Sequence, residues 1–238
     1  MQADLTIIIP AKNEANLLPI LLRSLCEQDY ERMSATRVIV ADAGSTDGTV
    51  MAALSFCDRL LVEVISGGLP SVGRNAGARL ATTRFLLFLD ADVELPDPTL
   101  LRRALWRMRT KNLHLATTNI ACSEGALFDD VLYAGNNFMQ RVGSFTKPFA
   151  TGMFMLFDRD AFWTLGGFNE RALFAEDYLL SKGVARLRFR IVRGRVFTTN
   201  RRFRKLGHWT MVRMFVKTMM HSWDDGYFFR DQDYWTEI

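Results

Sequence analysis

The sequence predicts an α/β protein in which a mostly parallel, mixed sheet is flanked by helices, and three observations support this. Residues 5–92 alternate between short apolar runs and stretches with apolar residues at helical spacing, which is typical of strands joined by helices. Each apolar run ends in polar turn residues. The 238 residues are 49% hydrophobic and contain no repeat or low-complexity linker, so one large core can form.

The first half of the chain reads as three strand–helix units followed by a fourth strand. Pro10 ends the first strand, near residues 5–9, because its nitrogen cannot donate to the ladder. Leucines at helical spacing over residues 17–25 follow. Gly73–Gly77 is expected to open the third helix. The further strands are expected near residues 37–41, 60–65 and 85–89.

The second half is expected to alternate in the same way. Pro98 starts a helix that ends near Lys111, and a short helix from Arg159 ends at Gly166-Gly167. The remaining expected helices are at 127–142 and 209–223, and the remaining expected strands are at 115–121, 149–157 and 186–191.

Asp90-Ala91-Asp92 follows the apolar strand near 85–89 and is the most informative motif. Ligands of open α/β sheets bind outside the carboxyl ends of the strands, where these two carboxylates emerge. Carboxylate oxygens suit Mg²⁺ or Mn²⁺, which can hold a diphosphate. Taken alone, the motif is more typical of a polar turn that closes a strand.

Three upstream motifs change that balance through their order and spacing. They are IIIPAKNE at 7–14, ADAGSTDGT at 41–49 and GRNAG at 73–77; LDAD at 89–92, GGFNE at 166–170 and Glu176-Asp177 follow them. On these motifs the chain resembles the family 2 glycosyltransferases over residues 4–205. The resemblance implies the nucleotide-sugar-binding GT-A fold.

The resemblance also implies a role for particular residues in holding the nucleotide. Asp42 would accept a hydrogen bond from the base, most naturally from N3–H of uracil, and Arg74 would offer a fork to the nucleotide or diphosphate. For Arg74 the alternative is a surface cation near a helix start. The full implied nucleotide set is Pro10, Ala11, Glu14, Asp42, Arg74, Asp90 and Ala91.

The catalytic and metal assignments come from the same resemblance. Asp177 is the first choice for the base that takes the acceptor proton and Glu176 the second, although either acid could instead favour a helix start. Asp92 is the best ligand for Mn²⁺ or Mg²⁺, with Asp90 beside it. His208 could complete the metal site, or it could be an ordinary packed histidine.

The chain departs from the family pattern in two places. Many members have paired aspartates where this chain has Asp42-Ala43. The common Gln-x-x-Arg-Trp is missing, and residues 201–204 read Arg-Arg-Phe-Arg instead. The second departure argues against a processive polymerase.

The sequence divides into a predicted catalytic domain at 1–205 and a helical tail at 206–238. Residues 182–217 hold twelve Lys or Arg and no acid, and residues 209–223 are rich in Met and aromatic side chains. Such a helix suits an anionic membrane interface, but packing on the domain or a homodimer contact explains it equally. No recognised nucleic-acid-binding fold accompanies the basic strip.

The sequence thus predicts a metal-dependent hexosyltransferase that uses a nucleotide sugar, UDP-linked and inverting, with a hydroxyl acceptor such as a lipid-linked or cell-envelope glycan. The alternatives are a sugar-phosphate nucleotidyltransferase and an inactive scaffold that binds a nucleotide sugar or a membrane. No signal sequence, no apolar run near ~20 residues and three scattered cysteines predict a cytoplasmic protein, with peripheral membrane association as an option.

Overall fold

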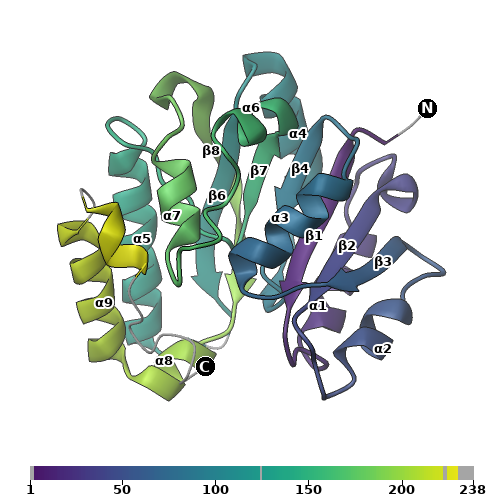
Figure 1. Ribbon diagram of the computed structural model, residues 1–238, viewed down its shortest axis with the longest axis horizontal. Helices are drawn as coiled ribbons and strands as arrows, with labels where there is room; N and C mark the ends of the chain where they lie inside the picture. The colour runs from purple at the N-terminus through teal and green to yellow at the C-terminus, as the bar shows by residue number, and fades with distance from the viewer. Residues whose placement is uncertain (1–2, 124, 222–223, 230–238) are drawn as a thin grey trace.

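The structure, a computed structural model, describes residues 3–123, 125–221 and 224–229. The described strands form one eight-stranded sheet in the order β3-β2-β1-β4-β7-β6-β8-β5 (Figure 1). The strands are β1 (Leu5–Ala11), β2 (Arg37–Asp42), β3 (Leu61–Ser66), β4 (Phe85–Phe88), β5 (Val93–Glu94), β6 (Leu115–Cys122), β7 (Met155–Asp158) and β8 (Phe189–Thr198).

Helices flank this sheet and connect its strands. They are α1 (Leu18–Cys26), α2 (Thr49–Leu54), α3 (Pro70–Leu80), α4 (Leu100–Lys111), α5 (Leu127–Gly143), α6 (Arg159–Thr164), α7 (Glu176–Ser181), α8 (Arg201–Leu206) and α9 (His208–Met220). Three short 3₁₀ helices, η1 (Met33–Ala35), η2 (Arg186–Arg188) and η3 (Asp225–Phe229), complete the described elements.

The pairing directions decide where the loops meet. β1 pairs in parallel with β2 and β4, and β6 pairs in parallel with β8. β7 lies between β4 and β6 and is antiparallel to both, so β6 runs in the direction of β4. The carboxyl ends of β1, β2, β4, β6 and β8 therefore share one edge of the sheet, as the predicted mixed α/β sheet requires.

Alternating side chains of β1 separate two cores. Ile7 and Ile9 pack with the buried leucines of α1 and α4, and Ile8 packs with residues of α3 and α6 on the other face. All three side chains are fully buried. In Figure 1, α3 and α7 lie on the near face of the sheet.

Helix α3 approaches the sheet more closely than a side chain at Gly77 would allow. A Cβ added at Gly77 would lie 2.6 Å from Cγ2 of Ile8. The GRNAG motif lies inside α3, which begins at Pro70, so the prediction that the motif opens this helix was wrong. The absence of a side chain at Gly77 lets α3 pack closely on β1. This packing also holds Arg74, on the same helix, near the carboxyl edge of the sheet.

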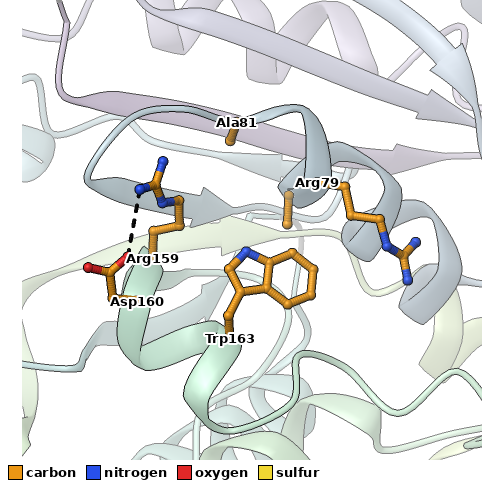
Figure 2. Close-up of a pocket in the computed structure, with 6 residues that line it drawn as sticks. Arg79, Ala81, Arg159, Asp160 and Trp163 are labelled. Carbon is orange, nitrogen blue, oxygen red and sulfur yellow. Dashed lines mark ion pairs between the residues drawn. The ribbon is translucent and has the colours of Figure 1, made fainter.

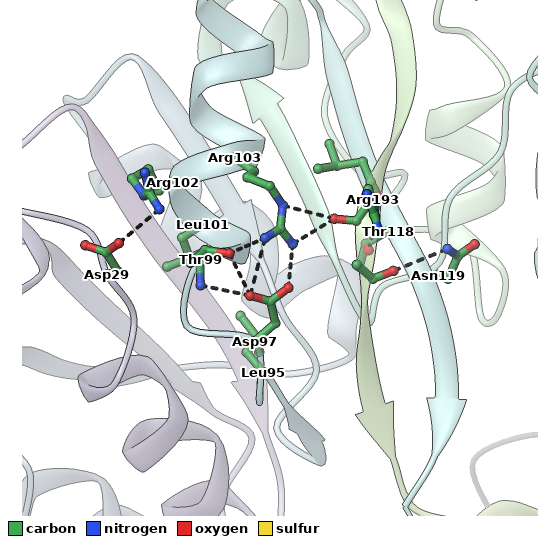
Figure 3. Close-up of polar contacts among 12 residues, drawn as sticks. Asp29, Leu95, Asp97, Thr99, Leu101, Arg102, Arg103, Thr118, Asn119 and Arg193 are labelled. Atoms are coloured by element: carbon green, nitrogen blue, oxygen red, sulfur yellow. Dashed lines mark hydrogen bonds and ion pairs between the residues drawn. The ribbon is translucent and has the colours of Figure 1, made fainter.

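A cluster of polar side chains joins α4 to β8, near the β8–β5 end of the sheet (Figure 3). Arg103 donates to Asp97 Oδ2 at 2.5 Å and, through Nη2, to the carbonyl of Arg193 at 2.8 Å. The hydrogen bond from Arg103 lowers the pKa of Asp97 to about 2. The cluster fixes β8, and β8 leads directly into α8.

Two strand predictions were wrong in their bounds. The strand expected at 149–157 begins only at Met155, because backbone donors before it bond to α7: Ala150 N to Ser181 Oγ at 3.0 Å and Gly152 N to Asp177 Oδ2 at 2.8 Å. The strand expected at 186–191 begins at Phe189, after η2. The two-residue β5 at the sheet edge was not predicted.

Hydrogen bonds join the described C-terminal elements to the rest of the fold. His208 on α9 bonds to Asp129 on α5 at 2.6 Å. Phe228 of η3 is fully buried, and its carbonyl accepts a bond of 3.0 Å from Leu173 N. α8 spans both sides of the predicted boundary at 205/206, and α9 ends at Met220; Trp223, its predicted end, lies outside the described residues.

Candidate active site

The loops that follow β1 and β2 are joined by hydrogen bonds between the two sequence motifs. Asn13 N donates to Ser45 Oγ at 2.9 Å, and Thr46 N donates to Asn13 Oδ1 at 2.9 Å. Glu14 N donates to Thr49 Oγ1 at 2.7 Å. IIIPAKNE and ADAGSTDGT therefore form one rigid wall at the carboxyl edge of the sheet.

Asp42 ends β2 in this wall with one oxygen satisfied and one not. Its Oδ2 accepts from Gly44 N at 3.1 Å and from Ser45 N at 3.0 Å. Its Oδ1 is buried and has no hydrogen-bond partner among the described residues. A buried carboxylate oxygen that lacks a hydrogen bond destabilises the ligand-free fold. A hydrogen-bond donor on a bound ligand would satisfy this oxygen.

Arg74 on α3 connects the Asp-x-Asp loop to α7. Its guanidinium donates to Asp90 Oδ1 at 2.5 Å and to Glu176 Oε1, and its side chain is 3% exposed. Burial alone would lower the pKa of Arg74, but the charges of Asp90 and Glu176 outweigh it and raise the pKa. Arg74 is thus a buried, charged bridge, which differs from the expected fork open to a diphosphate and from the alternative of a surface cation.

Asp177 follows Glu176 in the first turn of α7. Gly152 N donates to its Oδ2 at 2.8 Å, and Tyr178 N donates to its Oδ1 at 2.7 Å. Burial, and then the negative charge of Glu176, raise the pKa of Asp177 to about 6. A carboxyl group with that pKa can take up a proton near neutral pH.

Gly152 is a part of this arrangement that the sequence reasoning missed. A Cβ at this position would lie 2.2 Å from Nη2 of Arg74 and 3.0 Å from Oδ1 of Asp90. The loop before β7 therefore passes directly over the Arg74–Asp90 pair while it binds Asp177. The only sequence signal was a glycine inside an apolar run.

Arg201 is the second residue that the sequence reasoning missed. It donates to Glu14 Oε1 at 2.5 Å and to Glu14 Oε2 at 3.1 Å, and it lies 3.8 Å from Asp92 Oδ2. Burial raises the pKa of Glu14 despite this pair, and the charges of Asp92 and Asp90 add to the rise. The arginine run at 201–204 was visible, but no spacing singled out its first member.

The carboxylates at this edge suit a divalent cation that also binds ligands other than protein side chains. Asp90 and Asp92 are 19% and 12% exposed at their side chains and offer hard oxygen atoms. Within the described residues, no three His, Cys, Asp or Glu side chains are grouped so that they could hold a metal by themselves. Mg²⁺ or Mn²⁺ held by one or two such carboxylates would take phosphate and water as its other ligands.

His208 does not join these aspartates. Its Nε2 lies 2.6 Å from Oδ1 of Asp129, which is buried and also accepts from Asn200 at 3.1 Å. The ring packs edge-on against Phe128. In the described structure His208 joins α9 to α5 through these contacts. Its assignment as a metal ligand stays a prediction.

The remaining predicted nucleotide residues lie at the same edge in different ways. Ala11 and Ala91 are 4% and 5% exposed, and their methyl groups belong to the core on the α1 side, so only their backbones face outward. Pro10 is half-buried next to Ala11 at the end of β1.

Asn75 holds the GGFNE motif against α3. Its Nδ2 donates to the carbonyl of Phe168 at 2.8 Å, and its Oδ1 accepts from Phe168 N at 3.0 Å. Nδ2 also donates to Glu170 at 2.9 Å. GRNAG and GGFNE are thus one structural unit, and Glu170 is a partner of Asn75 and of Arg79 in the described fold.

A surface hollow of about 540 Å³ lies between α3 and α6, away from these acids (Figure 2). Arg79, Arg159 and Trp163 surround it, and Arg159 lies 3.6 Å from Asp160. Its α3 lining comes from the last turn of that helix, whereas Arg74 is in the first half. None of the predicted site residues lines it.

Curated relatives match parts of the chain. A validoxylamine A glucosyltransferase of Streptomyces hygroscopicus subsp. jinggangensis is 38% identical over 93 residues, which are 37% of this chain and 22% of the relative. The uncharacterized glycosyltransferase YibD of Escherichia coli is 31% identical over 120 residues, 48% of this chain and 33% of the relative. This chain spans a third or less of the length of these relatives.

Solved structures match most of the chain. The mannosyltransferase PcManGT of Pyrobaculum calidifontis, in complex with GDP-Man and Mn²⁺, superposes with a TM-score of 0.66 at 22% identity, over 92% of this chain and 65% of that one. TarS of Staphylococcus aureus in complex with UDP-GlcNAc gives 0.60 at 20% identity, over 83% and 56%. At these identities the likeness shows the shared GT-A fold.

The family comparison matches the stretch that carries the motifs. The sequence profile of glycosyl transferase family 2 covers residues 6–166, from β1 through the glycine that follows α6. This range is more than half of the chain and includes Glu14, Asp42, Asp90 and Asp92 at the carboxyl edge of the sheet. The chain belongs to glycosyl transferase family 2.

Proposed function

We propose that this chain transfers a sugar from a nucleoside diphosphate sugar to a hydroxyl acceptor. The observation that carries the proposal is the convergence of acids from three separate segments at one sheet edge: Asp42 at the end of β2, Asp90 and Asp92 after β4, and Asp177 on α7. Each has a different environment, so each can serve a different part of such a reaction.

The donor would be held by the wall formed by the loops after β1 and β2. The partnerless Oδ1 of Asp42 would accept an N–H of the base, for which N3–H of uracil is suited. We favour UDP as the nucleotide on this ground. The relative TarS was solved with UDP-GlcNAc and PcManGT with GDP-Man, so both bases occur among proteins of this fold.

The diphosphate would lie over the Asp-x-Asp loop. Asp92, with Asp90, would hold Mn²⁺ or Mg²⁺, and the bound cation would neutralise charge on the leaving diphosphate. Arg74 holds Asp90 in place through its 2.5 Å hydrogen bond. Arg201, which donates to Glu14 beside Asp92, adds a cation on the other side of the loop.

Asp177 would act as the base in an inverting transfer. Its raised pKa lets it accept the acceptor proton, and the hydrogen bonds from Gly152 N and Tyr178 N fix its orientation. Glu176 is bound to buried Arg74, so the structure favours Asp177 for this role. We propose a glycan acceptor, lipid-linked or of the cell envelope, as the name of TarS, a poly(ribitol-phosphate) N-acetylglucosaminyltransferase, suggests.

The sugar-phosphate nucleotidyltransferase alternative is disfavoured. Such enzymes hold the phosphates of the nucleotide with a glycine-rich loop after the first strand. Here that loop reads Pro10 to Glu14 without a glycine, and Glu14 is bound to Arg201. The other alternative, an inactive scaffold, would have no use for the raised pKa of Asp177. A measurement of sugar transfer distinguishes such a scaffold from an active enzyme.

Calorimetric titration of UDP, GDP and CDP, each with Mn²⁺ and with EDTA, tests the proposal. We expect one diphosphate, UDP, to bind with Mn²⁺ and to bind at least about tenfold more weakly with EDTA. Asp92→Asn should remove this metal dependence. Asp160→Asn, at a side chain that is 88% exposed on α6, is the matched control and should bind as the wild type does.

Two results would overturn the proposal. Folded wild-type protein that binds none of the three diphosphates would exclude the nucleotide site. Full metal-dependent binding by Asp92→Asn would remove Asp92 from the metal assignment.

A further inference from the structure

Helix α5 carries an apolar stripe that faces away from the sheet. The exposed fractions are 83% for Leu127, 56% for Val131, 65% for Phe138, 43% for Val142 and 72% for Phe145. Their spacing places them on one face of the helix and its C-terminal extension. Single exposed apolar residues are ordinary, but an aligned series of large ones marks a contact surface.

Helix α9 adds a second stripe beside the first. Trp209 is 81% exposed, Val216 46% and Met220 71%, again at helical spacing. The first turns of α5 and α9 are in contact through the His208–Asp129 bond and the Phe128–His208 ring pair, whose centroids are 4.9 Å apart (Figure 1). We call these eight exposed side chains the α5–α9 face.

The charge around the α5–α9 face is strongly positive. Arg141 on α5, Arg204 on α8 and Arg213 on α9 are exposed, so both helices of the face and the helix that precedes α9 carry an exposed cation. Residues 182–217, which include α8 and most of α9, contain twelve Lys or Arg and no acid. Asp129, on α5, is buried against His208, and Asp130 is the exposed acid of that helix.

We propose that the α5–α9 face docks this protein on an anionic membrane surface. Apolar side chains can enter the boundary between headgroups and acyl chains, and the surrounding arginines are attracted to anionic headgroups. Trp209 combines a large apolar ring with an N–H donor, which suits that boundary. Apolar stripes, an exposed tryptophan and exposed cations on the same helices together match a lipid surface.

A second copy of the chain fits this surface less well. A twofold dimer would pair the face with itself, so Arg141, Arg204 and Arg213 of both copies would be brought together. Like charges so placed repel each other. An anionic lipid surface, in contrast, supplies the opposite charge over the whole face.

The α5–α9 face lies near the carboxyl edge of the sheet, so docking through this face would bring that edge close to the membrane. α5 follows β6 and α8 follows β8, and the carboxyl ends of β6 and β8 share the edge at which β4 ends. The first turns of α5 and α9 therefore lie at the edge that holds Asp90 and Asp177. This part of the argument rests on the proposed function: an acceptor anchored in the membrane would meet the sugar donor at that edge.

Sedimentation with vesicles tests the docking without any donor or acceptor. We expect the full chain to bind phosphatidylcholine vesicles that contain about one third phosphatidylglycerol, and to bind pure phosphatidylcholine at least about tenfold more weakly at low salt. Phe138→Glu and Trp209→Glu should each weaken binding by at least about tenfold. Met51→Glu, at a residue of α2 that is 71% exposed, is the matched control and should not.

Three results would overturn the docking proposal: no binding to anionic vesicles, equal loss in Met51→Glu, or unchanged binding in both variants of the face. A dimer by light scattering that Phe138→Glu dissociates, with no lipid binding, would assign the face to a second copy. Nucleotide titration of the same variants separates this proposal from the proposed function, because neither substitution touches the donor site.

Discussion

Arg74 donates a 2.5 Å hydrogen bond to Asp90 from a side chain that is 3% exposed. The same guanidinium donates to Glu176, so one buried cation joins α3, the loop after β4 and the first turn of α7. The first aspartate of the Asp-x-Asp motif and the acid next to the proposed base are thus both bound to the same guanidinium. Four predictions concern this arrangement and its neighbours.

Replacement of Arg74 by Ala should destabilise the fold and abolish transfer. The substitution leaves Glu176, a buried residue, without its partner, and loss of one member of a buried ion pair costs about 3–5 kcal/mol. Arg74→Lys keeps the charge but not the fork, so we expect a smaller stability loss and still at least about tenfold lower kcat. Urea denaturation and steady-state kinetics measure the two effects; wild-type kcat in Arg74→Lys would contradict the bridging role.

Replacement of Gly152 by Ala should damage the site more than the fold. The added methyl would lie 2.2 Å from Nη2 of Arg74, which cannot move away because both its partners hold it. We expect a stability loss of about 1–3 kcal/mol and a fall in kcat of at least about tenfold. Gly135→Ala on α5 is the control, since a Cβ there meets no atom within 4 Å. Equal kinetics in the two variants would contradict the close approach.

The rate of transfer should depend on the ionisation of Asp177. A raised pKa of about 6 means that the carboxyl is protonated, and so unable to act as a base, below that pH. We expect kcat to rise roughly tenfold per pH unit up to about pH 6 and then to level off. Asp177→Asn should keep donor binding and lose at least about a hundredfold in kcat. A pH profile that stays flat between pH 5 and about 7 in the wild type would remove Asp177 from this role.

Replacement of Arg201 by Ala should weaken donor use. Without Arg201, Glu14 loses two hydrogen bonds, and its charge adds to those of Asp90 and Asp92 where a diphosphate would bind. We expect KM for the donor to rise about tenfold, with partial recovery in Arg201→Lys. Arg204→Ala, at an exposed position of the same helix, is the matched control. If both alanine variants raise KM equally, the effect belongs to the general charge of α8 and Arg201 has no specific role.

Local signals predicted most of the elements correctly. β1, β2, β3 and β4 were predicted because apolar runs end in turn residues, and α4 and α5 because their apolar residues recur at helical spacing. The errors at 149–154 and 186–188 arose because apolar or alternating residues looked like strands. In the structure the backbone donors of Ala150 and Gly152 bond to side chains of α7, and residues 186–188 turn as η2.

The sequence by itself determined the family, the mixed α/β sheet and the acids that end its strands, because motif spacing and hydrophobic pattern are local properties of the chain. Only the tertiary structure decided which charges meet. Arg74 and Glu176 are 102 residues apart, and Arg201 and Glu14 are 187 apart, so no local pattern could pair them. The same reason applies to His208, which lies 79 residues from Asp129 and meets it only because α5 and α9 pack together.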